Sequence, residues 1–252
     1  MKISQVQKIT LAALLLALTI ILTRITPLQN IPIIPWIRIS LGPALIIFSS
    51  ILLGPIYGAI VGAGSDILGI VLFPNSLGYG INPLFTLVYG LLGTLPWFIF
   101  FLVKRIKNQH IPLICLIIAG ILTYLGLVYL IFFSTLINQN YTFETYQKWL
   151  IVSIAFALLV GTIISVFFIN RFYRKRYGEI FSPYKIAFVC LACEVLLMLI
   201  LNSFVKTITF DVNYWIIFFA QAIVFFVDVP LNTFVVEGLL ILTNKFKGNL
   251  IN

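Results

Sequence analysis

The chain alternates long apolar runs with short polar segments. A helix that crosses the hydrocarbon core of a bilayer needs about 20 mostly apolar residues. Runs that approach or reach this length lie near residues 8–26, 40–54, 55–74, 83–103, 111–136, 149–170, 184–205 and 214–243. The pattern predicts an all-α integral membrane protein, a polytopic helix bundle of about eight spans within a single transmembrane domain.

The run at 40–54 is shorter than the others and lies between two helix-breaking pairs. Gly42-Pro43 stands near its start and Gly54-Pro55 at its end. Proline fixes φ and removes a backbone donor, so helices begin or stop at such pairs. We expect this run to form a tilted or incomplete span.

Composition supports the membrane assignment. Apolar residues make up 62% of the chain and charged residues 9%, against roughly 45–50% and about 25% in an ordinary soluble domain. A soluble fold could not hide so much apolar surface, whereas a lipid bilayer removes the problem. The net charge of +9 is split among short loops, so we expect no nucleic-acid partner. The three cysteines lie in apolar runs and form no metal-ligand set, and Cys190 and Cys193 have no histidine nearby, so we interpret all three as packing residues.

Lysine and arginine are unevenly distributed between the two sides that eight spans would create. If the N-terminus is cytoplasmic, twelve of the sixteen basic residues fall on the cytoplasmic side. The other four are Arg24, Arg38, Lys148 and Lys206. This split satisfies the positive-inside rule, and an odd number of spans would break it. We therefore expect a multi-pass protein of a bacterial cell membrane with both termini in the cytoplasm.

Four acidic residues lie inside the expected spans, where a central charge costs about 2.5–3.5 kcal/mol. Asp66, Glu194 and Asp228 are open to two interpretations. They form a ligand or ion site in the bundle interior, or they serve internal polar pairing or are carboxyls kept neutral by burial. For Asp66 the architecture of a helix junction is a further alternative. Glu237 lies near the expected cytoplasmic end of its span, and we expect its carboxylate to reach the membrane interface.

Two segments on the expected outer side have compositions suited to a lid. Residues 24–38 contain three prolines yet are too apolar for a solvated loop, and residues 74–83 are rich in Gly, Asn and Pro. Arg24 and Arg38 place two cations there, which could bind an anionic ligand with about 1.5–3 kcal/mol per charge-assisted hydrogen bond. The alternative is that these arginines only mark the membrane interface.

Common enzyme motifs are absent from the sequence. There is no phosphate-binding Gly-x-x-x-x-Gly-Lys-[Ser/Thr] loop, no His-Glu-x-x-His and no Gly-x-Ser-x-Gly. The single histidine, His110, lies in a basic loop, where solvation accounts for it. We expect no enzymatic activity, no cofactor and no metal site. Uphill transport would then require an ion gradient or an energising partner.

The residues that follow the first lid segment resemble a known family. The stretch Arg38–Gly69 and the motifs Leu72-Phe73-Pro74, Gly78-Tyr79-Gly80 and Phe85-Thr86-Leu87 are similar to the substrate-binding S component of energy-coupling-factor vitamin transporters, in its folate-type branch. This resemblance covers roughly residues 8–100. It implies a high-affinity vitamin-binding membrane subunit that works with a transmembrane T component and two ATPase subunits.

The family has six spans, so the resemblance implies an extra helical hairpin here. Residues 1–104 then form the N-terminal part of the core, 105–183 an inserted hairpin and 184–252 the last two core helices. The motif Ala13-Leu-Leu-Leu-Ala17 is similar to the small-residue stripe that docks on the T component in the family.

The resemblance also implies a vitamin site near the outer face. The residues that would hold the substrate are Arg24, Arg38, Tyr79, Asn82, Phe85, Asn202 and Asn232. Aromatic side chains would stack on a pterin ring and arginine would bind its carboxylates.

One departure bears on the substrate. The folate-type branch has basic residues in its last span, where this chain has Gln221 and Val224. Folate remains the expected substrate, and another vitamin or small metabolite is the alternative. Two readings from other classes stay open: an autonomous transporter with Asp66, Glu194 or Asp228 as proton carriers, and a membrane-embedded enzyme.

Overall fold

The computed structural model describes residues 4–24, 40–73, 81–106, 108, 110–133, 144–177 and 183–249. Side chains are described in these ranges except at 174–177, 183 and 244–249. Arg38 and Tyr79 lie outside the described residues.

The described chain is helical apart from short connections. Its elements are α1 (Gln5–Arg24), α2 (Gly42–Leu53), α3 (Pro55–Leu72), α4 (Pro83–Lys104), α5 (His110–Phe133), α7 (Thr145–Tyr177), α8 (Pro183–Cys193), the π-helix η2 (Glu194–Leu201), α9 (Asn202–Phe210) and α10 (Tyr214–Asn249). Within the described ranges, seven helical segments are long and apolar enough to cross a membrane, counting α8, η2 and α9 as one, and α2 is shorter. This confirms the predicted polytopic bundle.

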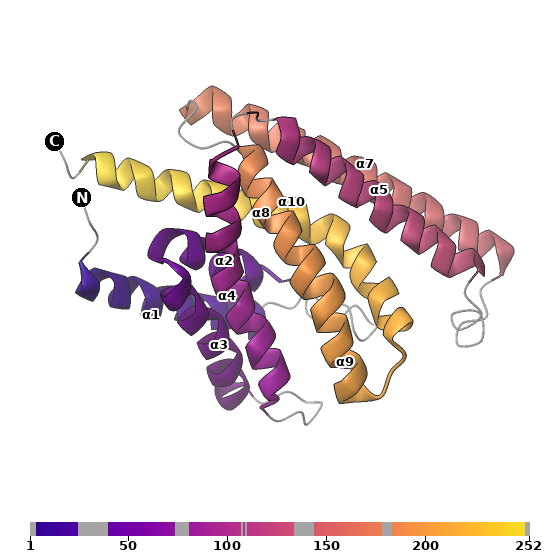
Figure 1. Cartoon of the computed structure of the whole chain (residues 1–252), viewed down its shortest axis with the longest axis horizontal. Coiled ribbons are helices and arrows are strands. Elements are labelled where there is room, and N and C mark those ends of the chain that lie inside the picture. The colour runs from indigo at the N-terminus through magenta and orange to yellow at the C-terminus, as the bar shows by residue number, and fades with distance from the viewer. Residues whose placement is uncertain are drawn as a thin grey trace.

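The helices form two groups that share α8, η2 and α10. Helices α1 to α4 form one packed group. Within it, α2 also contacts α10, and α4 also contacts α8. The α5–α7 pair packs against the other side of α8 and α10, as Figure 1 shows. The start of α1 and the end of α10 lie on the same side of the view in Figure 1.

Helix α2 is the short span that the sequence predicts. Its 12 residues extend about 18 Å at 1.5 Å per residue, less than the roughly 30 Å of a hydrocarbon core. Nearly all its side chains are buried, so it lies inside the bundle. It ends at Gly54, whose φ of 101° is a conformation that glycine adopts readily, and Pro55 then opens α3.

Helices α3 and α4 cross with their backbones almost in contact. A Cβ atom added at Gly58 would strike the carbonyl oxygen of Gly93, and one added at Gly62 would strike that of Tyr89. Small residues allow helices to approach this closely in a membrane, where dispersion contacts drive helix association.

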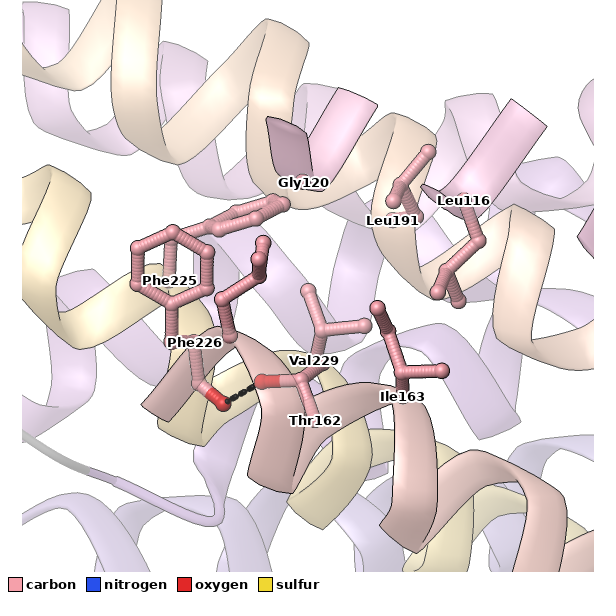
Figure 2. Close-up of a pocket in the computed structure, with 9 residues that line it drawn as sticks. Leu116, Gly120, Thr162, Ile163, Leu191, Phe225, Phe226 and Val229 are labelled. Carbon is pink, nitrogen blue, oxygen red and sulfur yellow. Dashed lines mark hydrogen bonds between the residues drawn. The ribbon is translucent and has the colours of Figure 1, made fainter. Parts of the chain in front are cut away.

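The α5–α7 pair meets α8 and α10 along an apolar interface. Figure 2 shows a small recess there, lined by Leu116, Gly120, Leu159, Thr162, Ile163, Leu191, Phe225, Phe226 and Val229. Thr162 is the polar residue of this lining, and its hydroxyl donates to the carbonyl oxygen of Phe226 at 2.6 Å. The recess therefore offers no spare polar group to a ligand.

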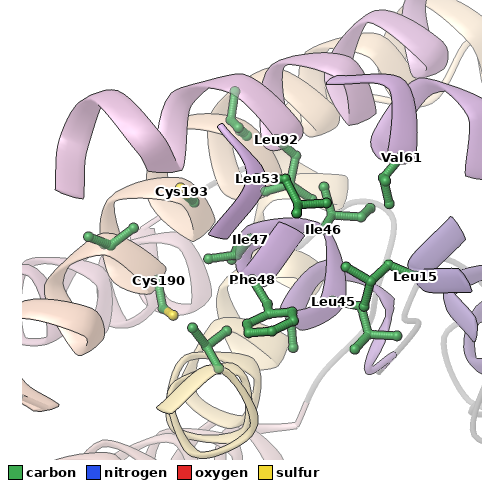
Figure 3. Close-up of a cluster of buried hydrophobic side chains, with 14 of the residues drawn as sticks. Leu15, Leu45, Ile46, Ile47, Phe48, Leu53, Val61, Leu92, Cys190 and Cys193 are labelled. Atoms are coloured by element: carbon green, nitrogen blue, oxygen red, sulfur yellow. The ribbon is translucent and has the colours of Figure 1, made fainter. Parts of the chain in front are cut away.

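The larger apolar core lies around α2. Figure 3 shows Leu45, Ile46 and Phe48 of α2 together with Cys190 and Cys193 of α8. Both cysteines are buried and free. Their place in this apolar core agrees with the interpretation of Cys190 and Cys193 as packing residues.

The span from Pro183 to Phe210 contains a feature that its apolar pattern does not predict. Its central eight residues, Glu194–Leu201, form a π-helix between two α-helical segments. Such segments are rare in proteins, and those that occur are often found at functional sites.

Candidate functional site

Asp66 of α3 joins three helices at one end of the bundle. Its Oδ1 lies 3.7 Å from Nη2 of Arg24, the last residue of α1. Its Oδ2 accepts a hydrogen bond of 2.8 Å from the Thr86 hydroxyl of α4. The side chains of Arg24 and Asp66 are only 11% and 5% exposed. Gly69 leaves room for the arginine, because an added Cβ would lie 2.9 Å from Arg24 Nε.

Asn82 joins the start of α4 to the end of α9. Its Oδ1 accepts the backbone N–H of Leu84 at 3.0 Å and so caps α4. Its Nδ2 donates to the Thr209 hydroxyl at 2.8 Å. One turn further, the rings of Phe85 and Phe210 lie 6.0 Å apart. We call Arg24, Asp66, Asn82, Phe85, Thr86, Thr209 and Phe210 the helix-end cluster.

The helix-end cluster contains three of the predicted site residues, Arg24, Asn82 and Phe85. It borders both predicted lid segments in sequence, since Arg24 directly precedes residues 25–39 and Asn82 closely follows residues 74–80. The ion pair and the hydrogen bonds therefore hold the helix ends from which these segments extend.

Two other predicted site residues lie elsewhere. Asn202 begins α9, seven residues before Thr209, and its Nδ2 approaches Met198 Sδ at 3.9 Å. Asn232 is fully buried in α10 and donates from Nδ2 to Glu194 Oε1 at 2.7 Å. The structure does not bring these two asparagines into the helix-end cluster.

Three members of the helix-end cluster had no predicted role: Thr86, Thr209 and Phe210. Thr86 could have been found, because it stands four residues after Asn82 and so shares its helix face. Thr209 and Phe210 are more than 120 residues away along the chain, and nothing local marks them.

Glu194, Asp228 and Asn232 form a second polar group, which we call the buried carboxyl cluster. Their side chains are 2%, 6% and 0% exposed. The nearby Glu237 is only 1% exposed. The expectation that its carboxylate reaches the membrane interface is therefore wrong: α10 continues to Asn249, three turns beyond Glu237, which keeps that side chain inside the bundle.

In the helix-end cluster the charge of Arg24 is already matched by Asp66. An anionic ligand at Arg24 would have to compete with that carboxylate, which favours a structural part for both residues. The cluster is suited to a structural role, because its contacts fix α1, α3, α4 and α9 relative to one another. The half-buried Phe85 ring lies at these helix ends.

Comparison with known proteins identifies the family of this chain. The family described as "ECF transporter, substrate-specific component" matches residues 7–173, from α1 into α7. The "Folate transporter FolT" of Clostridium novyi (strain NT) is 29% identical over 163 residues, which cover 65% of this chain and 76% of that protein. No solved structure matches the chain. The family match spans about two thirds of the chain, and the structure is a bundle of apolar helices long enough to cross a membrane. This protein therefore belongs to the family of ECF transporter substrate-specific components.

Proposed function

We propose that this chain captures a vitamin on the outer side of the membrane, with folate as the favoured substrate, and delivers it through an energy-coupling-factor complex. The observation that carries the proposal is the family match over residues 7–173. The folate transporter of Clostridium novyi supports folate over other vitamins.

We place the vitamin at the segments that extend from the helix-end cluster. Arg38 and Tyr79 lie within these segments, and Asn82 and Phe85 lie at their base. Arginine suits the carboxylates of folate, and aromatic rings suit its pterin. Because Arg24 pairs with Asp66, we assign it the role of positioning the first segment. Asn202 and Asn232 are not included in this site.

Energy for transport would come from partners, since the sequence has no phosphate-binding loop of the ATPase type. We propose a T component and two ATPase subunits. Ala13 and Ala17 are exposed on α1, so the small-residue stripe is available to a partner helix.

We also propose that residues 105–183 are a hairpin added to a six-helix core. Lys185 Nζ donates to the Lys104 carbonyl oxygen at 3.2 Å, so the end of α4 and the start of α8 are already adjacent. Both α5 and α7 pack against α8 and α10 at the side of the bundle. A direct connection from α4 to α8 would therefore need only a short linker.

Binding by the purified chain tests the proposal. The full-length protein in detergent, without partners or ATP, is titrated with folate and separately with other vitamins while tryptophan fluorescence is followed. We expect saturable quenching by folate at nanomolar concentration. Quenching by a different vitamin would retain the subunit class and replace the substrate. A chain that binds none of them, yet accumulates a solute in partner-free proteoliposomes, would refute the proposal.

Arg38→Ala tests the anion contact. We expect a dissociation constant at least about tenfold higher, equivalent to about 1.4 kcal/mol. Arg105→Ala is the matched control, because Arg105 follows α4 at the opposite end of the bundle and lies over the Phe101 ring at 4.6 Å. Equal affinity in the two variants would exclude Arg38 from the site.

A further inference from the structure

The buried carboxyl cluster has more hydrogen-bond acceptors than donors. Asn232 Nδ2 donates to Glu194 Oε1 at 2.7 Å. Asn232 Oδ1 and Asp228 Oδ1 are buried and have no hydrogen-bond partner. Asp228 and Asn232 are four residues apart on α10, so they share one helix face. Asn232 therefore joins this face of α10 to Glu194 of η2.

In the part of the chain that the structure describes, neither Glu194 nor Asp228 has a lysine or arginine within ion-pair distance; the ion pair found there joins Arg24 and Asp66. A buried acceptor without a donor costs about 1–3 kcal/mol, and an unpaired ionised carboxylate costs more. A cation held between these oxygens would satisfy them.

The backbone is unusual at the same place. The π-helix η2 begins at Glu194, and at its other end the Asn202 N–H donates to the Leu197 carbonyl, five residues back. Single π-helical turns within α-helices occur frequently at functional sites. This observation is independent of the acceptor excess, and both involve Glu194.

We propose that Glu194, Asp228 and Asn232 form an intramembrane binding site for a small monovalent cation, Na⁺ or a proton. The ligands are carboxylate and amide oxygens, which suit hard cations. Two carboxylates and an amide supply fewer oxygens than the six to eight that Ca²⁺ takes, and we therefore propose a cation of single charge.

The site is separate from the proposed vitamin site. Asn232 stands 18 residues after Tyr214 along α10, about 27 Å from that end at 1.5 Å per residue. The titratable groups near the pair are Cys190 and Cys193 on α8 and Glu237 on α10. Helix α2, which also packs on α10, carries no titratable residue. A bound cation would link η2 to α10 and stabilise the bundle by mass action.

The first experiment measures thermal unfolding of the full-length chain in detergent, with Na⁺ exchanged for choline at constant ionic strength. The second records the infrared carbonyl band of protonated carboxylic acids in the same protein. Both are repeated on Glu194→Gln and Asp228→Asn. The control is Glu144→Gln, which makes the same chemical change at an exposed glutamate.

If the cation is Na⁺, the unfolding midpoint rises saturably with Na⁺ by several degrees, and this rise is lost in both cluster variants but kept in the control. If the cation is a proton, Na⁺ has no effect, and the wild type shows a carboxylic-acid band that the cluster variants lose and the control retains. Should one cluster variant fail to fold, the other supplies the comparison.

The proposal is overturned if the wild type shows neither a Na⁺ response nor a carboxylic-acid band. It is also overturned if folded cluster variants respond as the wild type does. Vitamin affinity is not part of either readout, so failure here would leave the proposed function standing.

Discussion

Replacing Asp66 by asparagine tests whether the helix-end cluster holds the bundle together. The substitution preserves the size of the side chain and the acceptor for Thr86, which donates at 2.8 Å. It removes the negative charge that lies 3.7 Å from Arg24 Nη2. The arginine, only 11% exposed, would be left buried without its carboxylate.

The loss can be bounded from this geometry. Breaking a buried ion pair by removing one partner costs about 3–5 kcal/mol, and a charged hydrogen bond contributes about 1.5–3 kcal/mol. Because the contact is longer than a direct hydrogen bond and Arg24 keeps slight exposure, we expect about 2–3 kcal/mol. For a chain of this size about 2–4 °C per kcal/mol applies, so the unfolding midpoint should fall by about 4–12 °C.

The buried cysteines provide the assay. Cys190 and Cys193 are 0% and 1% exposed, so a thiol-reactive fluorophore labels them only when the bundle opens. The half-buried Cys115 is replaced by alanine in every sample to remove early labelling. The midpoint of the labelling curve on heating then reports unfolding of the membrane bundle.

Two comparisons isolate the ion pair. Asp211→Asn makes the same change at an exposed turn residue with φ of 52°, a conformation that asparagine also tolerates, and it should leave the midpoint unchanged. Combined with Arg24→Gln, Asp66→Asn should destabilise less than the sum of the two single variants. Additive losses, or a shift no larger than that of Asp211→Asn, would refute the role assigned to this pair.

Three further predictions follow from the packing. Gly93→Ala should destabilise the bundle by about 1–3 kcal/mol, because its Cβ would strike the α3 backbone; Gly126→Ala, where a Cβ meets open space, should not, and the same labelling assay compares them. Ala13→Leu should abolish co-purification with the T component without changing vitamin affinity. Ala157→Leu, at an exposed position of α7, is the control and should preserve both. Normal co-purification of Ala13→Leu would exclude α1 from the docking surface. A chain in which a short glycine-serine linker replaces residues 106–182 should fold and bind the vitamin, as measured by fluorescence titration, and its failure to do so would count against an added hairpin.

Much of the fold was predictable because hydrophobic length is a local property. The eight apolar runs correspond to the seven long helical segments and α2, and Gly54-Pro55 ends α2 as predicted. The grouping of the candidate site residues was not predictable in the same way. Asn82 and Phe85 do lie with Arg24, but Asn232 lies with Glu194, and Glu237 is buried where an interfacial position was expected.

The sequence by itself determined that the chain is a helical membrane protein, where its spans lie to within several residues, and which family it resembles, because all three depend on residues close together along the chain. Only the tertiary structure decided that Arg24 meets Asp66, that Thr86 joins them, and that Glu194 faces Asn232. These pairings depend on how each helix is rotated about its axis. In a bilayer the lipid-facing and buried faces are both apolar, so hydrophobic periodicity says little about that rotation. It is set by close contacts between distant segments, such as Gly58 against Gly93.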